Sequence, residues 1–132
     1  MIIGHFDGAS RSNPGEAGAG AYLEEDEQIL WQAARYLGQK TNNEAEYTAL
    51  IMLLTAAKNL KIENLTVQGD SRLVICQVKR EWKINLPHLR ALAMQVWQLT
   101  EGMNVTFEWV KREKNKYADM LSNKALDEKD EK

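Results

Sequence analysis

The hydrophobic periodicity of this sequence changes at Thr41, and that change limits the possible folds more than any other feature. Before Thr41, three apolar stretches separated by turn-forming residues predict strands at residues 2–6, 18–23 and 28–36. After Thr41, apolar residues recur every three or four positions, which predicts a helix that follows an Asn cap and runs to about Leu60. Three successive strands joined by short turns favour an antiparallel meander.

Strands and helices alternate in the second half of the chain. Residues 64–69 and 105–110 have the short apolar pattern of strands. Helical spacing and capping residues predict helices at residues 71–80, 87–101 and 115–126. Alternation after a meander predicts an α/β protein whose mixed sheet has crossover connections and is flanked by helices.

The length of the chain suits one hydrophobic core. Of its 132 residues, 44% are hydrophobic and 27% are charged. No internal repeat and no linker rich in Pro, Gly or Ser interrupts the pattern, so we predict one domain over residues 1–126. Residues 127–132 are all charged, and we predict that they form a disordered, solvated tail.

Composition excludes several classes of protein and site. A formal net charge of -2 gives no overall positive field, so any contact with nucleic acid must be local. The longest apolar run falls far short of the roughly 20 residues of a membrane-spanning helix, and no secretory signal is visible, so we expect a cytoplasmic protein without membrane contact. With only Cys76, His5 and His88 available, a bound metal must be held by oxygen.

Four acidic residues occupy positions that suit a shared site. Glu46 lies on the apolar stripe of the first predicted helix, where an ionised carboxylate needs a partner. Asp7 and Asp70 each end a predicted strand at its carboxyl side, where open α/β sheets place their ligand sites. Asp119 lies early in the last predicted helix, which can hold it at the edge of the same crevice. Taken singly, each acid also has a structural explanation. Glu46 suits the margin of a helix stripe and Asp7 suits a turn. Asp70 suits a helix cap, and Asp119 suits a solvated helix face.

Taken together, the four carboxylates predict a site for hard divalent cations. A carboxylate cluster without His or Cys prefers Mg²⁺ or Mn²⁺ to Zn²⁺, and the cation relieves the repulsion among the acids. Two such ions about 4 Å apart suit the hydrolysis of a phosphodiester bond, because one activates water and the other stabilises the leaving oxygen.

Five short motifs, taken with this order of elements, resemble type 1 ribonuclease H. They follow one another in the family's order along nearly the whole chain. They are Asp7-Gly8-Ala9-Ser10, Asn13-Pro14-Gly15, Thr41-Asn42-Asn43-Glu44-Ala45-Glu46-Tyr47, Gly69-Asp70-Ser71, and Asn115 with Ala118-Asp119. A short Asp-Gly-Ala-Ser loop is weak evidence by itself, whereas separate motifs in the same order and at fitting distances are strong evidence.

The resemblance implies a ribonuclease H-like fold and a specific reaction. The implied fold has a five-stranded mixed sheet, in which an antiparallel meander is joined to two parallel strands, with helices on its flanks. The implied reaction is the cleavage of the RNA strand of RNA/DNA hybrids, leaving 3′-hydroxyl and 5′-phosphate ends. Asp7, Glu46, Asp70 and Asp119 match the family's catalytic acids and metal ligands, for two Mg²⁺ ions with Mn²⁺ as a substitute. No protein partner is evident, and a monomer is the default expectation.

Residues around the acids are predicted to contact nucleic acid. Small residues in the first loop let a strand approach closely, and Asn13 is suited to reading the 2′-hydroxyl of RNA. By resemblance, Thr41 and Asn43 hold a phosphate of the DNA strand, while Asn42 faces the RNA. The full predicted set is Gly8, Ser10, Asn13, Thr41, Asn42, Asn43 and Arg72.

The sequence departs from the family pattern in two places. Many members have a His in the loop before the last helix, whereas this chain has Arg112 and Glu113 there, which are predicted to give at most partial assistance. The long basic insertion of some members is absent, and Trp82 in the short segment that remains is expected to fold onto the core. These departures leave two alternatives: a catalytically silent relative that binds hybrids, and a related nuclease that acts on double-stranded RNA.

Overall fold

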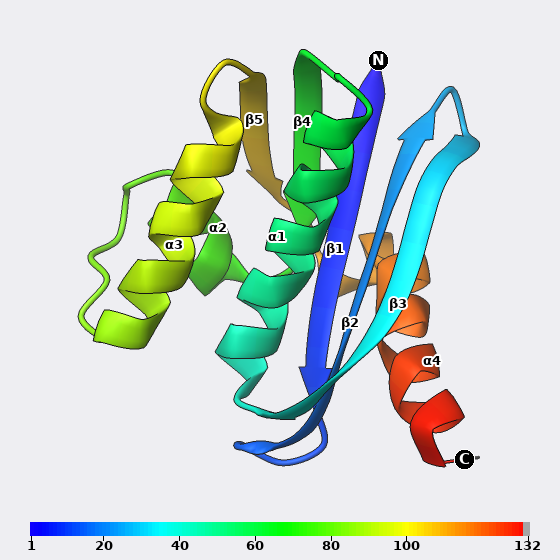
Figure 1. Ribbon diagram of the computed structural model, residues 1–132, viewed down its shortest axis with the longest axis vertical. Coiled ribbons are helices and arrows are strands. Elements are labelled where there is room, and N and C mark those ends of the chain that lie inside the picture. The colour runs from blue at the N-terminus through cyan, green and yellow to red at the C-terminus, as the bar shows by residue number, and fades with distance from the viewer. Residues whose placement is uncertain (131–132) are drawn as a thin grey trace.

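The computed structural model describes residues 1–130 and contains one mixed sheet of five strands (Figure 1). The strands lie in the order β3-β2-β1-β4-β5. Pairing is antiparallel between β1 and β2 and between β2 and β3, and parallel between β1 and β4 and between β4 and β5. The predicted meander followed by two parallel strands is therefore confirmed. The strands are β1 (Ile2–Ser10), β2 (Gly15–Glu25), β3 (Gln28–Lys40), β4 (Asn64–Gly69) and β5 (Asn104–Trp109).

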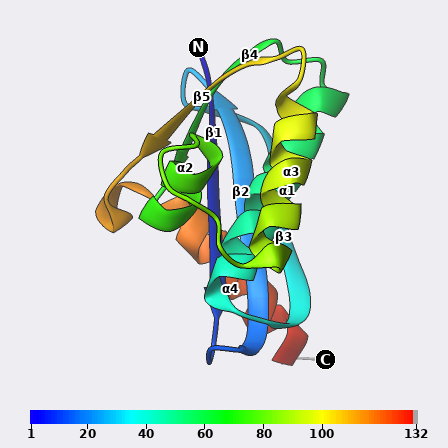
Figure 2. The same ribbon diagram turned by 90° about the vertical axis from the view of Figure 1, so that its left-hand side faces the viewer.

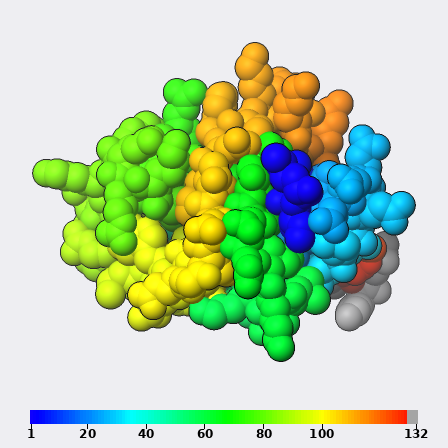
Figure 3. Space-filling model, turned by 90° about the horizontal axis from the view of Figure 1, so that it is seen from above, coloured from blue at the N-terminus to red at the C-terminus, as the bar shows by residue number. Residues whose placement is uncertain are grey.

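Helices cover both faces of this sheet. They are α1 (Asn42–Asn59), α2 (Arg72–Val78), α3 (Pro87–Thr100) and α4 (Lys116–Asp130), with a short 3₁₀ turn, η1 (Arg112–Lys114), before α4. Figures 1 and 2 show α1 and α3 on one face and α4 on the other. Seen from above in Figure 3, the first residues lie between the β2–β3 turn and the connection from α1 to β4, as the strand order requires.

Helix α1 is fixed at its beginning by a reciprocal pair of hydrogen bonds. The cap is Thr41 rather than an Asn: its side chain accepts from the Glu44 amide, and the Glu44 side chain accepts from the Thr41 amide. Leu50 and Leu53 are fully buried, as the helical spacing predicts. Leu60 is 51% exposed, because the helix has ended and Leu60 follows it as the C-terminal cap.

Strand β1 is longer than predicted, and Asp7 lies within it rather than after its end. Antiparallel pairing with β2 continues to Ser10, whereas parallel pairing with β4 stops at the pair Phe6 and Gly69. Asp7 is therefore the first residue of β1 beyond the parallel pairing. For this reason Asp7 still lies close to Asp70, as predicted, although β1 does not end at Asp7.

The predicted charged tail is helical as far as the structure describes it. Helix α4 continues through Asp130, and Leu126, the last residue of the predicted domain, is buried. No Gly or Pro interrupts this segment, and Lys124 pairs with Glu128 one turn further along the helix. Asp127 also pairs with Arg11 of the β1–β2 loop. Residues 131–132 lie outside the described residues.

The connection between α2 and α3 differs from expectation at Trp82. This side chain is 47% exposed rather than folded onto the core. Trp97 of α3 packs there instead: its indole nitrogen donates to the Val78 carbonyl at 3.0 Å, and the Arg80 guanidinium lies 3.8 Å from the centre of its ring. Since Trp97 already covers the end of α2, Trp82 remains at the surface.

Among residues 1–130, no helix is both long and apolar enough to cross a membrane.

Candidate active site

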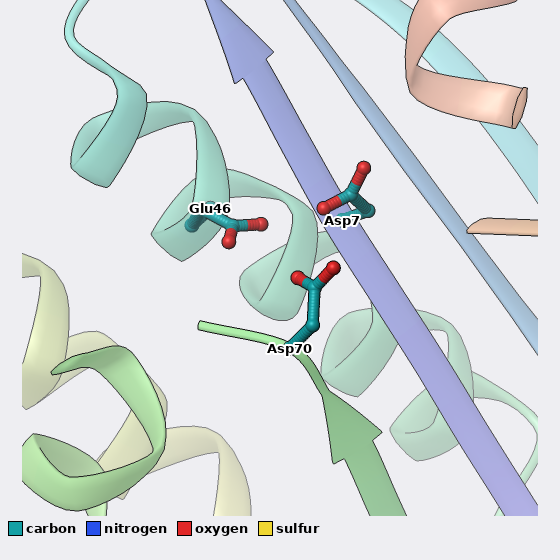
Figure 4. Close-up of side chains that lie close together, drawn as sticks. All are labelled: Asp7, Glu46 and Asp70. Atoms are coloured by element: carbon teal, nitrogen blue, oxygen red, sulfur yellow. The ribbon is translucent and has the colours of Figure 1, made fainter. Parts of the chain in front are cut away.

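Three carboxylates from three different elements converge at one place (Figure 4). Asp7 comes from β1, Glu46 from α1, and Asp70 directly follows β4. Their side chains point toward one another, and one oxygen atom from each lies within 4.8 Å of the others. The structure thus brings together three of the four acids predicted from the sequence.

Glycine and strand register produce this convergence. Helix α1 crosses β1 so closely that a Cβ atom on Gly8 would overlap the backbone of Ala45 and Glu46. The same approach lets the Gly8 amide donate a hydrogen bond to Glu46 Oε1 in the buried interior. On the other side, the register of β1 with β4 brings Asp70 level with Asp7. A side chain at position 8 would push Glu46 away from the other two acids.

Helix α4 brings the fourth acid to the edge of the same group. The helix lies directly over Gly18 and Gly20 of β2, where added Cβ atoms would overlap its backbone. Asp119 of α4 is half-buried and lines the cleft that contains the other three acids. The buried Asn115 holds the beginning of α4 to β1, because its Nδ2 donates to the Phe6 carbonyl at 2.9 Å.

Burial and mutual repulsion raise the pKa values of the converging acids. The pKa of Asp7 is raised to about 8, first by burial and then by the charges of Asp70 and Asp119. Burial followed by the charges of Asp7 and Asp70 raises the pKa of Glu46 well above its usual range. The pKa of Asp70 is raised by burial, and this rise is opposed by a hydrogen bond with Asp7 and by the charge of Arg112. Without a cation, burial and mutual repulsion therefore favour the protonated forms of Asp7 and Glu46.

The donor set of this group fits a hard divalent cation. Every side chain that converges is a carboxylate, and the ligating oxygens are close enough for one ion to contact all three. A cation would replace the protons and reverse the upward pKa shifts, since an adjacent positive charge favours the ionised form. Asp7, Glu46 and Asp70 are therefore the residues that can hold such an ion, and Asp119 is placed beside them.

An open cleft of about 600 Å³ surrounds the acids. Of the predicted nucleic-acid contacts, Gly8, Ser10 and Asn42 line this cleft. Four predicted contacts, Asn13, Thr41, Asn43 and Arg72, lie outside its lining.

Two of the predicted contacts outside the lining, Asn13 and Arg72, lie against residues at the site. Asn13 Oδ1 accepts from the Asn42 amide at 3.2 Å, and Asn42 Oδ1 accepts from the Ser10 amide at 3.0 Å. These two bonds fasten the β1–β2 loop to the beginning of α1. Arg72 lies over the ring of Trp109, 4.4 Å from its centre.

The loop that lacks a His places one of its two predicted residues at the site. Arg112 lines the cleft, and its charge lowers the pKa of Asp70. Glu113 is exposed in η1 and does not belong to the lining. The structure therefore separates two residues that the sequence treated alike.

Among the site residues that the sequence did not predict, three form hydrogen bonds with the acids. Ser122 is fully buried and donates a hydrogen bond to Asp7, Asn123 lines the cleft and donates to Asp119, and the indole of Trp109 donates to the Asp70 carbonyl at 3.1 Å. Ser122 lies three positions after Asp119 and so shares its helix face, which was the available signal. No comparable pattern marks Trp109.

Comparison with known proteins finds relatives that match nearly the whole chain. A family model described as reverse transcriptase-like matches residues 5–125. A bifunctional protein of Mycobacterium tuberculosis is 40% identical over 96% of this chain, and a ribonuclease HI of Halobacterium salinarum is also 40% identical over 96%. The chain covers 35% of the length of the mycobacterial protein and 65% of the length of the Halobacterium protein.

Solved structures agree with this result over nearly the whole chain. The crystal structure of ribonuclease H1 from Halobacterium salinarum has a TM-score of 0.92 at 38% identity, covering 96% of this chain and 98% of that one. A ribonuclease H1 isolated from compost, solved in complex with an RNA/DNA hybrid, has a TM-score of 0.92 at 32% identity, covering 97% and 98%. Because the family model, the sequence relatives and the solved structures agree on the same residues and topology, the chain belongs to the type 1 ribonuclease H family.

Proposed function

We propose that this protein is a metal-dependent endoribonuclease that hydrolyses the RNA strand of RNA/DNA hybrids and leaves 3′-hydroxyl and 5′-phosphate ends. The observation that carries the proposal is the convergence of Asp7, Glu46 and Asp70 in an open cleft. The fold supports the choice of substrate, since the compost relative was solved with such a hybrid.

The four acids have distinct proposed roles around two Mg²⁺ ions, for which Mn²⁺ is a substitute. Asp7, Glu46 and Asp70 would hold the two ions, and Asp119 would be a further ligand of the second ion. When bound, the ions activate water as a nucleophile and neutralise the charge that develops on the phosphate. The Gly8 amide holds the Glu46 carboxylate in position, and it does so in the buried interior where the bond is not exchanged with water.

Substrate contacts are proposed on both sides of the acids. Ser10, Asn13 and Asn42 form a hydrogen-bonded group beside the cleft, which suits it to reading the 2′-hydroxyls of the RNA strand. Thr41 and Asn43, at the beginning of α1, are proposed to hold a phosphate of the DNA strand. The exposed Arg72 completes the proposed contacts with nucleic acid.

We propose that Arg112 takes over part of the catalytic role that the loop His has in many other members of the family. Its cationic side chain lines the cleft beside Asp70 and can stabilise negative charge on the phosphate or on the departing product. Glu113 is less suited to this role because it does not line the cleft.

Replacing Arg112 with Ala should lower turnover by roughly 10- to 100-fold, whereas the matched Glu113→Ala variant should retain nearly full turnover.

The monomer is the proposed active form, since every residue of the proposed site comes from one chain. Light scattering after size-exclusion chromatography, with and without hybrid, measures the mass of the active species. A dimer that alone retains activity would contradict this part of the proposal.

The decisive experiment compares three labelled duplexes of one sequence: an RNA/DNA hybrid, double-stranded RNA and double-stranded DNA. Each is incubated with wild-type protein and with Asp70→Asn in Mg²⁺, in Mn²⁺ and in EDTA. We expect cleavage of the hybrid alone, dependent on the metal and lost in the variant, with 5′-phosphate ends on the products.

The other possible outcomes distinguish the alternatives. Hybrid binding without cleavage in either metal would identify a silent binding protein. Cleavage of double-stranded RNA at a comparable rate would show that the cleft does not require a DNA strand. Cleavage of the hybrid at the wild-type rate by Asp70→Asn protein that has been freed of contaminating nucleases would remove Asp70 from the mechanism.

A further inference from the structure

Ser122 lies between the metal-binding acids and the sheet, in a position that its neighbours define closely. It is fully buried, and the backbone of α4 at this residue touches Gly18 and Gly20 of β2. The serine hydroxyl has two acceptors within reach: Asp7 Oδ2 at 3.1 Å and the Asp119 carbonyl at 2.8 Å. A serine has one hydroxyl proton, so it can satisfy only one of them at a time.

The surroundings of the two acceptors favour donation to Asp7. The Asp119 carbonyl also accepts from Asn123 Nδ2 at 2.9 Å, so it keeps a donor when the hydroxyl turns away. Asp7 is buried, and a buried carboxylate oxygen without a donor is costly. Hydrogen bonds to a carboxylate are also stronger than those to a neutral carbonyl.

This bond gives Asp7 what a metal ligand requires. A carboxylate oxygen that accepts a buried hydrogen bond keeps one orientation, and groups that orient a ligand in this way raise its affinity for the ion. The Ser122 hydroxyl reaches Asp7 Oδ2 in the buried interior, so it favours a single orientation of this carboxylate.

We infer that Ser122 is a positioning residue of the metal centre, which increases the affinity for divalent cations by holding the Asp7 carboxylate through its hydroxyl group. This inference rests on the proposed function, because it assumes that Asp7 is a metal ligand. It goes beyond that function by assigning part of the metal affinity to a residue that contacts neither the ion nor the substrate.

The test measures Mn²⁺ affinity directly, by following the electron paramagnetic resonance signal of free Mn²⁺ during titration. Ser122→Ala removes the hydroxyl without adding any atom to the tightly packed site, and Ser122→Thr keeps a hydroxyl. We expect the dissociation constant for Mn²⁺ to rise about 10-fold in the Ala variant and to return toward the wild-type value in the Thr variant. Thr55→Ala is the matched control, because it removes an exposed helical hydroxyl that bonds only the Ile51 carbonyl.

A second readout separates positioning from a general loss of structure. In hybrid cleavage, the Mn²⁺ concentration for half-maximal rate should rise in Ser122→Ala, whereas the KM for the hybrid at saturating Mn²⁺ should stay unchanged. Thermal unfolding in EDTA establishes that each variant is folded, and Ser122→Cys, which offers a weak donor of similar size, replaces the Thr variant if the added methyl group prevents folding.

The two proposals fail in different ways. Equal Mn²⁺ affinity in folded wild type and Ser122→Ala would overturn the role of Ser122 and leave the proposed function intact. No Mn²⁺ binding by the wild type would overturn the metal centre itself, and the role of Ser122 with it.

Discussion

Asp7 is surrounded by groups that act on its charge in opposite directions. Burial and the charges of Asp70 and Asp119 raise its pKa to about 8, while the Ser122 hydroxyl opposes this rise. These shifts favour the protonated form of the acids in the metal-free protein near neutral pH, and a bound cation would favour the ionised form. Stability, metal affinity and pH are linked through a few buried carboxylates.

Removing one charge from the group should stabilise the metal-free protein. In Asp70→Asn, the repulsion that Asp70 exerts on Asp7 and Glu46 is lost, and we expect the free energy of unfolding in EDTA to rise by about 1 kcal/mol, a modest value because Asp70 is half-buried. Hybrid cleavage should fall at least about 100-fold, since the loss of a ligand exceeds that of an orienting group.

Urea unfolding in EDTA measures this stability. Glu63→Gln is the control, because it neutralises an exposed acid outside the cluster and should leave the free energy of unfolding unchanged. Destabilisation of the metal-free protein by Asp70→Asn would argue that the carboxylate takes part in a favourable contact rather than in repulsion.

The raised pKa values also predict the pH dependence of stability. Between 3.8, the ordinary pKa of an Asp side chain, and about 8, the folded protein binds more protons at Asp7 than the unfolded chain does. The free energy of unfolding in EDTA should therefore fall as the pH rises through this range, and Glu46 acts in the same direction. Two groups act in the opposite direction. Glu44, whose pKa is lowered by its hydrogen bond with the Thr41 backbone, does so around pH 4.5 and below. His5, whose pKa is lowered by burial, does so around its ordinary pKa of 6.5 and below.

Thermal unfolding at a series of pH values in EDTA tests this slope. Asp7→Asn should flatten it, and Mg²⁺ should abolish it by stabilising the ionised acids at the upper end of the range. A metal-free protein that becomes steadily more stable from pH 5 to pH 8 would show that the acids do not lie as close together in solution.

At the level of elements, the position of α4 depends on two residues without side chains. Gly18 and Gly20 of β2 allow the helix to lie against the sheet, and this approach brings Asp119 and Ser122 to Asp7. The contact explains how a helix at the end of the chain completes a site that begins at its seventh residue.

Filling this contact should separate α4 from the acids. In Gly20→Ala, the new methyl group meets the backbone of Ser122 and Ala118, which cannot move aside as a side chain can, and we expect a loss of about 2–3 kcal/mol of stability. Activity should fall together with metal affinity. Gly4→Ala is the matched variant: the atoms nearest to its methyl group belong to the side chain of Leu53, which can move, so the loss of stability should be smaller.

Denaturant unfolding and Mn²⁺ titration of both variants provide the measurement. Equal losses in the two variants, or unchanged metal affinity in Gly20→Ala, would mean that the close approach of α4 does not determine the geometry of the acids.

At the scale of the whole molecule, the net charge limits how the protein can bind a polyanion. The formal charge is -2, and the cations near the cleft are few, with Arg11 and Arg112 in its lining and Arg72 beside it. The acids at the centre of the cleft further oppose binding until cations occupy them. Affinity for the hybrid should therefore depend on a small number of phosphate contacts.

A shallow salt dependence follows from this distribution of charge. We expect the logarithm of the hybrid association constant to fall with the logarithm of salt concentration with a slope of about -3, equivalent to three or four neutralised phosphates. Fluorescence anisotropy with the inactive Asp70→Asn protein measures it without cleavage, and Arg72→Ala should reduce the slope by about one. A slope steeper than about -6 would reveal a larger cationic surface than the cleft provides.

Much of the fold was predictable because its elements are locally encoded. The alternation of the meander, the leucine spacing of α1 and the order of later strands and helices all predicted the observed topology. Boundaries were less predictable: β1 continues to Ser10 through pairing with a distant strand, and α4 continues past Leu126 into a segment whose composition indicated a tail. The partial burial of Trp97 and the exposure of Trp82 depended on which of the two packed against α2.

The sequence by itself determined the chemistry of the site, because a carboxylate in an apolar pattern and acids at strand ends are unfavourable unless a cation joins them. It also identified Arg112 and Asn42 among the residues of the cleft. Only the tertiary structure decided which side chains complete the site, since the bond between Ser122 and Asp7 joins residues 115 positions apart and depends on the packing of α4 over β2. Hydrophobic periodicity indicates which face of a helix or strand is buried, whereas the element that packs against that face depends on the whole fold.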